Sequence, residues 1–272
     1  MTKKPASDTQ GGVRSARDPW STLRRFTSAR IGLGRTGGSI PTHELLDFQL
    51  AHARARDAVN HAFDVTAFGE QLRERQIDCL ALNSAAGDRH TYIQRPDLGR
   101  ILDNESRTLL QARASNESPD VVFVIADGLS ALAIERHGPP LIEMIHTYLV
   151  REGWRIAPCC LVSQGRVAIG DEIGALLDAR LSVVLIGERP GLSSPDSLGA
   201  YLTWNPLPGR SNAERNCISN IRPRGLSYQA AAFKLLHLMQ QARTRKLSGI
   251  GLKEDAALPA PEQLQKLFPS HP

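Results

Sequence analysis

The feature that most constrains the fold is an unbroken apolar run, "VVFVIA" at 121–126, which ends in Asp127 and Gly128. A β-branched run without polar interruption is typical of a strand that is buried on both faces of a parallel sheet. Two further runs follow, "WRIAPCCLV" at 154–162 and "LSVVLIGE" at 181–188, and a helix-length segment separates each from the next. Strands that alternate with helices predict an α/β fold with a doubly wound, mostly parallel, Rossmann-like sheet.

The pattern divides the chain into three parts. Residues 1–18 are polar and rich in Gly, Ser and charge, so we expect a disordered arm. Residues 19–115 are expected to form a mainly helical N-terminal region, in which apolar residues recur at helical spacing from Thr42 to Phe63. Residues 116–272 are expected to form the Rossmann-like domain.

Individual helices can also be predicted. In the N-terminal region, Pro96 and Asp97 are expected to open a helix that carries the apolar residues from Ile101 to Leu110. In the Rossmann-like domain, apolar spacing predicts helices over 140–153, 171–180 and 228–246.

Composition excludes several classes of function. The 33 Lys and Arg against 28 Asp and Glu give a net charge of +5, but the basic clusters lack interleaved aromatic residues, so no nucleic-acid partner is expected. No apolar run reaches the length of about eighteen residues that spans a membrane, so no membrane-spanning helix is expected.

The four cysteines form no C-x-x-C pair, which indicates a reducing, cytoplasmic compartment and no zinc site. Cys159 and Cys160 end an apolar run, where we expect them to act as small buried hydrophobic residues of a strand. No metal ligand is predicted.

One glycine pattern raises a separate hypothesis. Gly32, Gly34 and Gly37 in "IGLGRTGG" match G-x-G-x-x-G, and Asp57 follows twenty residues later. A dinucleotide fingerprint needs a buried strand before the first glycine and a helix at the third. The preceding "TLRRFTSARI" carries three arginines and Pro41 delays the helix, so we predict a turn. A nicotinamide-dependent oxidoreductase stays open as an alternative function.

The predicted strand ends are the best place for a ligand site. In a doubly wound sheet, ligands bind outside the carboxyl ends of the strands. Asp127 and Gly128 follow the first strand, "SQGRVAIGDEIG" at 163–174 follows the second, and "GERPGLSSPDSLG" at 187–199 follows the third. We expect these segments to converge on one edge. The structural alternatives are that Asp127 serves merely as the cap of the next helix, and that Glu188 merely forms an ion pair with Arg189.

No catalytic group can be assigned from the residues. Ser193 and Ser194 lack the G-x-S-x-G pattern of a nucleophile elbow, which disfavours a hydrolase. His43, His52 and His61 are nine residues apart, too far for the i, i+4 spacing of shared metal ligation on one helix.

Four segments resemble one known family. They are "VVFVIADGLSALAI" at 121–134, "GRVAIGDEIGALL" at 165–177, "VLIGERPGLSSPDSLGAYLTW" at 184–204 and "NCISNIRPRGLSYQAAA" at 216–232. At these segments, and at "ARIGLGRTGG" and "YIQRPDLGR", the chain closely resembles the small subunit of ethanolamine ammonia-lyase, an adenosylcobalamin-dependent enzyme. The resemblance extends from about Asp18 to Gly249.

The resemblance implies a partner and a reaction. In that family a large catalytic subunit with a TIM barrel carries the radical chemistry that converts ethanolamine to acetaldehyde and ammonia, and the small subunit closes over the cobalamin. It implies a hetero-oligomer with several copies of each subunit, and no lyase activity or catalytic residue in this chain alone. A structural subunit that binds no ligand is the other alternative.

The family's cobalamin contacts correspond here to Val167, Glu188 and Cys217. Val167 would offer backbone hydrogen bonds and an apolar wall, Glu188 would accept hydrogen bonds from amide or ribose donors, and Cys217 would supply a small, soft packing surface. The sequence lacks the D-x-H-x-x-G motif of cobalamin proteins that replace the cofactor's base, as the resemblance implies.

The resemblance also bears on localisation. A cytoplasmic protein is expected, and some members of the family are packed into a bacterial microcompartment. Such members can carry an amphipathic N-terminal segment, whereas the first residues here are polar, which leaves encapsulation open.

Overall fold

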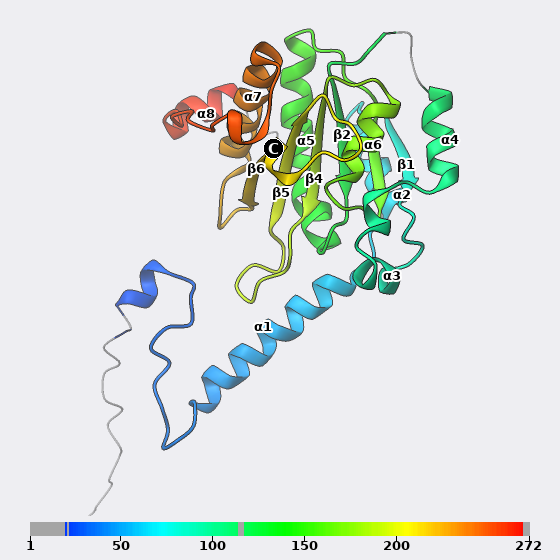
Figure 1. Ribbon diagram of the computed structural model, residues 1–272. Coiled ribbons are helices and arrows are strands. Elements are labelled where there is room, and N and C mark those ends of the chain that lie inside the picture. Colours follow the sequence, from blue (N-terminus) through cyan, green and yellow to red (C-terminus); the bar gives the residue numbers. More distant parts are fainter. Residues whose placement is uncertain (1–19, 21, 114–116, 269–272) are drawn as a thin grey trace, which may run out of the picture. The chain divides into compact units, whose positions relative to one another are not determined.

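The computed structural model describes residues 20, 22–113 and 117–268 (Figure 1). The expected disordered arm, residues 1–18, lies outside them. The chain divides into two compact units, Met1–His52 and Ala53–Pro272. Within the described ranges, no helix is both long and apolar enough to cross a membrane.

The second unit is built on one six-stranded sheet. Its strands are β1 (Cys79–Asn83), β2 (Val121–Ala126), β3 (Cys159–Ser163), β4 (Leu181–Gly187), β5 (Leu198–Trp204) and β6 (Arg215–Ile221). The order across the sheet is β1-β3-β2-β4-β5-β6. Strands β1, β2, β3 and β4 run parallel to one another. Strand β5 pairs antiparallel with both of its neighbours, β4 and β6. The predicted mostly parallel α/β sheet is therefore confirmed.

Helices cover both faces of the sheet (Figure 1). They are α2 (Val65–Glu74), α5 (Ala131–Arg151) and α7 (Tyr228–Arg245) on one face, and α4 (Asn104–Arg113) and α6 (Ile169–Leu176) on the other. Successive residues of β2 alternate between the two cores, because side chains of a strand point to opposite faces: Phe123 lies in the first and Val124 in the second. Every residue of β2 is buried, as its apolar run predicted.

Three strands were not predicted. β1 lies in the region that was expected to be mainly helical, and β5 and β6 follow the last of the three predicted strands. β1 and β6 are the edge strands of the sheet, and each contains exposed as well as buried positions. Such edge strands have polar residues on the exposed side and lack the continuous apolar run that identifies a central strand.

The helix expected to start at Pro96 is interrupted. A 3₁₀ turn occupies Leu98–Arg100, and α4 begins only at Asn104. Ile101 and Leu102 lie between them in extended backbone, and Leu102 bridges to Ser84 beside β1. The apolar side chain of Leu102 is 1% exposed because it belongs to the sheet's second core, not to a helix face.

Helix α5 begins nine residues earlier than predicted, since it starts at Ala131 and the prediction started at residue 140. Ser130 caps it by accepting a hydrogen bond from the Ala133 backbone N–H, and the helix continues through Pro139 and Pro140. A proline inside a helix costs about 3 kcal/mol. The long buried face of α5 against the sheet offsets that cost. Helix α7 covers the predicted 228–246 almost completely.

The remaining elements are short except for one. Helix α1 (Thr42–Asn60) begins at Thr42 as predicted and crosses the boundary between the two units, and among its side chains only that of Ala58 is buried. The others are α3 (Arg89–Gln94), α8 (Pro261–Leu267) and the 3₁₀ turns Leu23–Phe26, Asn212–Glu214 and Gly249–Gly251.

Candidate functional site

A cavity of about 450 Å³ opens at the carboxyl ends of the parallel strands. Its walls come from the segments that follow β2, β3 and β4, together with β5 and α3. The lining residues are Tyr92, Gly128, Leu129, Arg166, Val167, Ile186, Gly187, Glu188, Arg189 and Tyr201. The expected convergence of the three strand-end segments on one edge is confirmed, and two of the three predicted site residues, Val167 and Glu188, share this cavity.

Glu188 follows β4 and is held by its own loop. Its backbone N–H donates to the Ser197 carbonyl at 2.9 Å, and its Oε2 accepts from the Ser197 hydroxyl and from the Asn220 backbone N–H at 3.3 Å. A Cβ atom on Gly199 would lie 3.0 Å from Oε1, so this glycine makes room for the carboxylate. In the described part of the chain Oε1 has no hydrogen-bond donor, and Glu188 forms no ion pair with Arg189. One carboxylate oxygen is therefore ready for a ligand.

Cys217 lies beside the cavity and not in its lining. It is directly opposite Tyr201 in the antiparallel pairing of β5 and β6, and the Tyr201 hydroxyl hydrogen-bonds its thiol. Desolvation raises the pKa of the Cys217 thiol, and the bond to Tyr201 opposes that shift. Tyr201 itself lines the cavity and connects Cys217 to it.

Val167 sits in the turn between β3 and α6. Its side chain packs against the second core, while its carbonyl accepts a hydrogen bond from the Gly170 backbone N–H. Among the described residues its own backbone N–H has no acceptor. Val167 therefore offers an apolar wall and one free main-chain donor.

Tyr92 forms a buried part of the cavity wall between two arginines. The guanidinium carbon of Arg166 lies 4.2 Å from the ring centroid, and that of Arg89 lies 4.8 Å from it. The Tyr92 hydroxyl donates to the Gly165 carbonyl at 3.2 Å, and burial raises the pKa of Tyr92 to about 12. The phenol is therefore a neutral platform that fixes the cationic side chains above the strand ends.

Asp127 connects the ends of β2 and β3. It is 2% exposed, accepts from the Gly165 backbone N–H at 3.1 Å, and lies 3.5 Å from Nη1 of Arg89. Burial raises the pKa of Asp127 to about 6. Since Ser130 caps α5, Asp127 is not the helix cap that we considered, and it does not line the cavity.

Two glycines of the cavity floor serve close packing. A Cβ atom on Gly128 would meet the Gly187 carbonyl oxygen at 2.3 Å, and one on Gly187 would meet the Ser130 carbonyl oxygen at 2.0 Å. Gly128 also adopts a φ of 58°, which favours glycine. The ends of β2 and β4 therefore touch through their backbones here.

The G-x-G-x-x-G stretch is a turn. Thr36 and Ser39 bond each other reciprocally through their backbones, at 2.8 and 3.2 Å, around Gly37 and Gly38. Within residues 20 and 22–31 no strand precedes it, and α1 starts only after Pro41. The geometry of a dinucleotide fingerprint is absent from this stretch.

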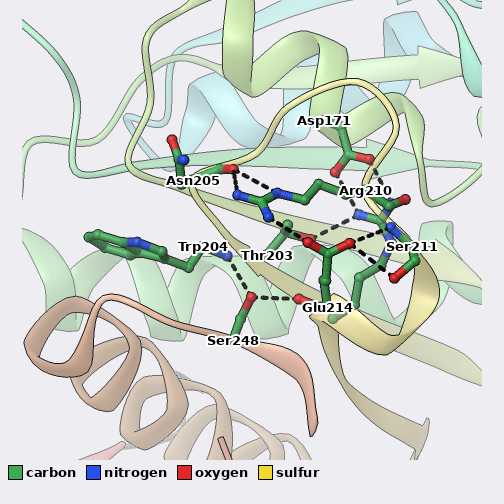
Figure 2. Close-up of polar contacts among 9 residues, drawn as sticks. Asp171, Thr203, Trp204, Asn205, Arg210, Ser211, Glu214 and Ser248 are labelled. Carbon is green, nitrogen blue, oxygen red and sulfur yellow. Dashed lines mark hydrogen bonds and ion pairs between the residues drawn. The ribbon is translucent and has the colours of Figure 1, made fainter. Parts of the chain in front are cut away.

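Charged side chains join β5 and β6 to α6 (Figure 2). Arg215 pairs with Asp171 and also donates to the Thr203 hydroxyl. Arg210 pairs with Glu214, and the Ser211 backbone N–H donates to the same carboxylate at 2.8 Å. These bonds hold the pKa of Glu214 at about 2.

Sequence reasoning did not single out three residues of the cavity: Tyr92, Arg166 and Tyr201. All three lie in segments that carry the family resemblance, "YIQRPDLGR", "GRVAIGDEIGALL" and "VLIGERPGLSSPDSLGAYLTW". Their residue types alone gave no reason to place a phenol under a guanidinium at the strand ends. Across the described ranges, no group of three or more His, Cys, Asp or Glu is arranged to hold a metal ion.

Comparisons with a family profile and with individual proteins identify the same family. The family profile described as ethanolamine ammonia-lyase light chain matches residues 17–253. The ethanolamine ammonia-lyase small subunit of Pseudomonas paraeruginosa is 57% identical over 244 residues, which cover 89% of this chain and 89% of the relative. The small subunit of Azotobacter vinelandii is 56% identical over 241 residues, covering 88% of this chain and 89% of the relative.

Proposed function

This chain belongs to the ethanolamine ammonia-lyase small-subunit family, and we propose on that premise that its strand-end cavity holds one side of adenosylcobalamin. It is thus a subunit of a carbon–nitrogen lyase. The observation that carries the proposal is the meeting of Val167 and Glu188 in one cavity, with Cys217 joined to it through Tyr201.

The lining suits the chemistry of a corrinoid. Cobalamin presents an apolar corrin edge, amide side chains and a nucleotide tail, which together need a mixed surface. Leu129, Val167 and Ile186 supply apolar contact, while the unpartnered oxygen of Glu188 would accept from an amide or ribose donor. The free backbone N–H of Val167 would donate to an amide carbonyl.

The size of the cavity supports a second subunit. Pockets that enclose a drug-sized ligand have volumes of about 300–1,000 Å³, and adenosylcobalamin is much larger than such a ligand. A cavity of about 450 Å³ would hold only part of the cofactor. The large subunit would therefore cover the other side, in a hetero-oligomer with several copies of each chain.

Within that assembly this chain's residues bind, orient and exclude water. The chemistry supplied by bound adenosylcobalamin is the homolysis that starts the conversion of ethanolamine to acetaldehyde and ammonia. The loop 188–197 would keep Glu188 at the cofactor's periphery, because Ser197 holds both its backbone and its carboxylate. The substrate would react in the large subunit. The assembled enzyme would lie in the cytoplasm, either free or inside a microcompartment.

The test is reconstitution from separately purified subunits. We expect this chain alone to show no deamination of ethanolamine, and the mixture with the large subunit and adenosylcobalamin to turn over. A visible difference spectrum of the mixture should show cofactor binding that the large subunit alone gives more weakly. Lyase activity in the isolated chain, comparable with that of the mixture, would contradict the division of labour.

The same preparation tests the two alternatives. A nicotinamide-dependent oxidoreductase would bind NAD or NADP in calorimetry, and Gly34→Ala would abolish the binding. A purely structural subunit would leave the spectrum and the affinity of the large subunit for adenosylcobalamin unchanged. We expect neither result.

A further inference from the structure

A second cavity, of about 390 Å³, adjoins the first and shares Arg166 and Val167 with it. Four of its eight lining residues are arginines, and no acidic residue lines it. The lining residues are Arg100, Arg166, Val167, Ala168, Arg210, Ser211, Asn212 and Arg215. This second cavity is therefore the cationic neighbour of the proposed cofactor site.

The carboxylates behind the second cavity neutralise only half of its arginines. Arg215 is paired with Asp171. Arg210 is paired with Glu214 (Figure 2). Neither Arg100 nor Arg166 forms an ion pair with any described residue. Two positive charges are left facing the cavity.

The Arg166 side chain is held in place, but one of its hydrogen-bond donors has no acceptor. Its backbone N–H donates to the Gly99 carbonyl at 2.7 Å, its Nη2 donates to the Tyr92 carbonyl at 3.1 Å, and its guanidinium stacks on the Tyr92 ring. A Cβ atom on Gly99 would meet Cγ of Arg166 at 2.8 Å, so the glycine clears the path of this side chain. Its Nε is buried and has no acceptor in the described part of the chain.

A buried, unpartnered donor is unfavourable until an acceptor binds it. An arginine that is fixed in orientation and faces a cavity is well suited to a phosphate, because its planar fork matches two phosphate oxygens. Arg100 supplies a second guanidinium on the same cavity. The shared Arg166 means that a ligand in the first cavity can reach the second.

We infer that Arg166 and Arg100 bind the phosphodiester group of the cofactor's nucleotide tail. The inference rests on the proposed function, and it assigns the two cavities to different parts of one ligand. The corrin amides, the ribose and the base are neutral hydrogen-bonding groups, and Glu188 and Val167 of the first cavity suit them. The phosphodiester is the anionic part of the tail, and it needs the cationic second cavity.

The experiment compares ligands with and without the phosphate in the complex with the large subunit. Adenosylcobalamin carries the nucleotide tail, and adenosylcobinamide lacks its phosphate, ribose and base. Dissociation constants are measured from visible absorbance or equilibrium dialysis, with cobinamide titrated to millimolar concentrations so that weak binding also gives a value. Activity is not needed as a readout.

We expect Arg166→Met and Arg100→Met to weaken adenosylcobalamin binding about ten- to a hundred-fold, as for loss of a hydrogen bond to a charged group. Adenosylcobinamide binding should change by less than about twofold. Adenosylcobinamide phosphate should show the loss again, because it regains the anionic group. Arg166→Lys should recover part of the affinity, since the charge returns without the fork.

The matched control is Arg113→Met. Arg113 ends α4, is exposed and lines a different cavity together with Pro119 and Ile156, which lie at the amino ends of the strands. Its substitution should change the dissociation constant of neither adenosylcobalamin nor adenosylcobinamide. Equal losses for cobalamin and cobinamide in the Arg166 and Arg100 variants, or no loss at all, would overturn the phosphate assignment. If wild-type complex bound cobalamin no better than the large subunit alone, the proposed function would fail instead.

Discussion

Arg215 and Asp171 form a two-point ion pair in which both nitrogen–oxygen distances are 2.6 Å and both side chains are 2% exposed. The pair joins β6 to the first turn of α6, and so fixes the turn that carries Val167 relative to the strand that carries Cys217. Nη1 of Arg215 also donates to the Thr203 hydroxyl, and Nη2 donates to the Arg210 carbonyl. This relationship connects two parts of the proposed site through the protein interior.

Arg215→Met should therefore lower the free energy of unfolding by about 3–5 kcal/mol, because it leaves a buried carboxylate without its partner. Urea denaturation followed by circular dichroism measures the change. Arg180→Met is the control: its guanidinium is half exposed and 3.4 Å from Asp120, so its loss should cost less than about 1 kcal/mol. The double variant Asp171→Leu/Arg215→Met should be more stable than Arg215→Met. Equal stability of the Arg215 and Arg180 variants would refute this account.

Glu188→Ala should raise the apparent constant for adenosylcobalamin about ten- to a hundred-fold in the reconstituted complex, since one hydrogen bond to a charged group is lost. The maximal rate at saturating cofactor should stay near the wild-type value. A contact at the cofactor's periphery is equally strong before and after the bond breaks, and so acts as uniform binding. Steady-state titration of the cofactor gives both values.

Glu188→Gln keeps the shape of the side chain and should show a smaller loss. Glu152→Ala, at the exposed end of α5, is the control and should leave the cofactor constant unchanged. A normal cofactor constant with a collapsed maximal rate in Glu188→Ala would mean that Glu188 serves the chemistry or the subunit interface.

Asp127 should make stability depend on pH. Burial raises the pKa of Asp127 to about 6, from an ordinary value of 3.8. Folding thus favours the protonated carboxyl, and this stabilisation is complete below about pH 4 and is lost as the pH rises through about 6. The shift corresponds to a fall of about 3 kcal/mol in the free energy of unfolding over that range.

Asp127→Asn should remove this fall, so that the variant gains stability relative to wild type as the pH rises from 4 to 6. Urea denaturation at several pH values measures the difference. Asp255→Asn is the control, because that carboxylate is 81% exposed and should leave the pH profile unchanged. If stability changed with pH in the same way in wild type and Asp127→Asn, Asp127 would have the same pKa in the folded and unfolded states.

Cys217 should be the thiol that reacts in the native protein. It is exposed, whereas Cys79, Cys159 and Cys160 are buried in neighbouring strands, and burial raises the pKa of Cys160 to about 12. Iodoacetamide followed by peptide mass spectrometry should locate the label at Cys217, and all four cysteines should react after unfolding.

Cobalamin binding to the complex should slow this labelling beyond the effect of the large subunit alone. Cys217→Ser should take up no label while folded. Labelling of Cys159 at a comparable rate in native protein would mean that the sheet opens readily at β3.

The central parallel strands β2, β3 and β4 could be predicted because burial on both faces of the sheet favours apolar residues at every position. β2 is buried on both faces, so its sequence has no polar residue and no alternation of polar and apolar positions. β1 and β6 lie at the two edges of the sheet, and their exposed positions hold residues such as Asn83 and Asn220. A five-residue edge strand differs little from a loop in sequence. Its pairing with β3 is decided by contacts that are distant along the chain.

The candidate site was predictable only in part. The rule that ligands bind beyond the carboxyl ends of parallel strands located the edge, and the family resemblance supplied Val167, Glu188 and Cys217. The stacking of Arg166 on Tyr92 joins residues that are 74 positions apart. An arginine in a loop is usually a solvated surface residue, and only the tertiary fold shows that this one is fixed over an aromatic ring.

The contact between Gly128 and Gly187 also sets a limit on how this protein can be re-engineered. Because the two backbones touch, any larger residue at either position would push the ends of β2 and β4 apart, and this part of the cavity wall cannot be reshaped by single substitutions. Attempts to accept altered corrinoids should leave both glycines unchanged. They should diversify other lining positions instead, such as Leu129 and Arg189.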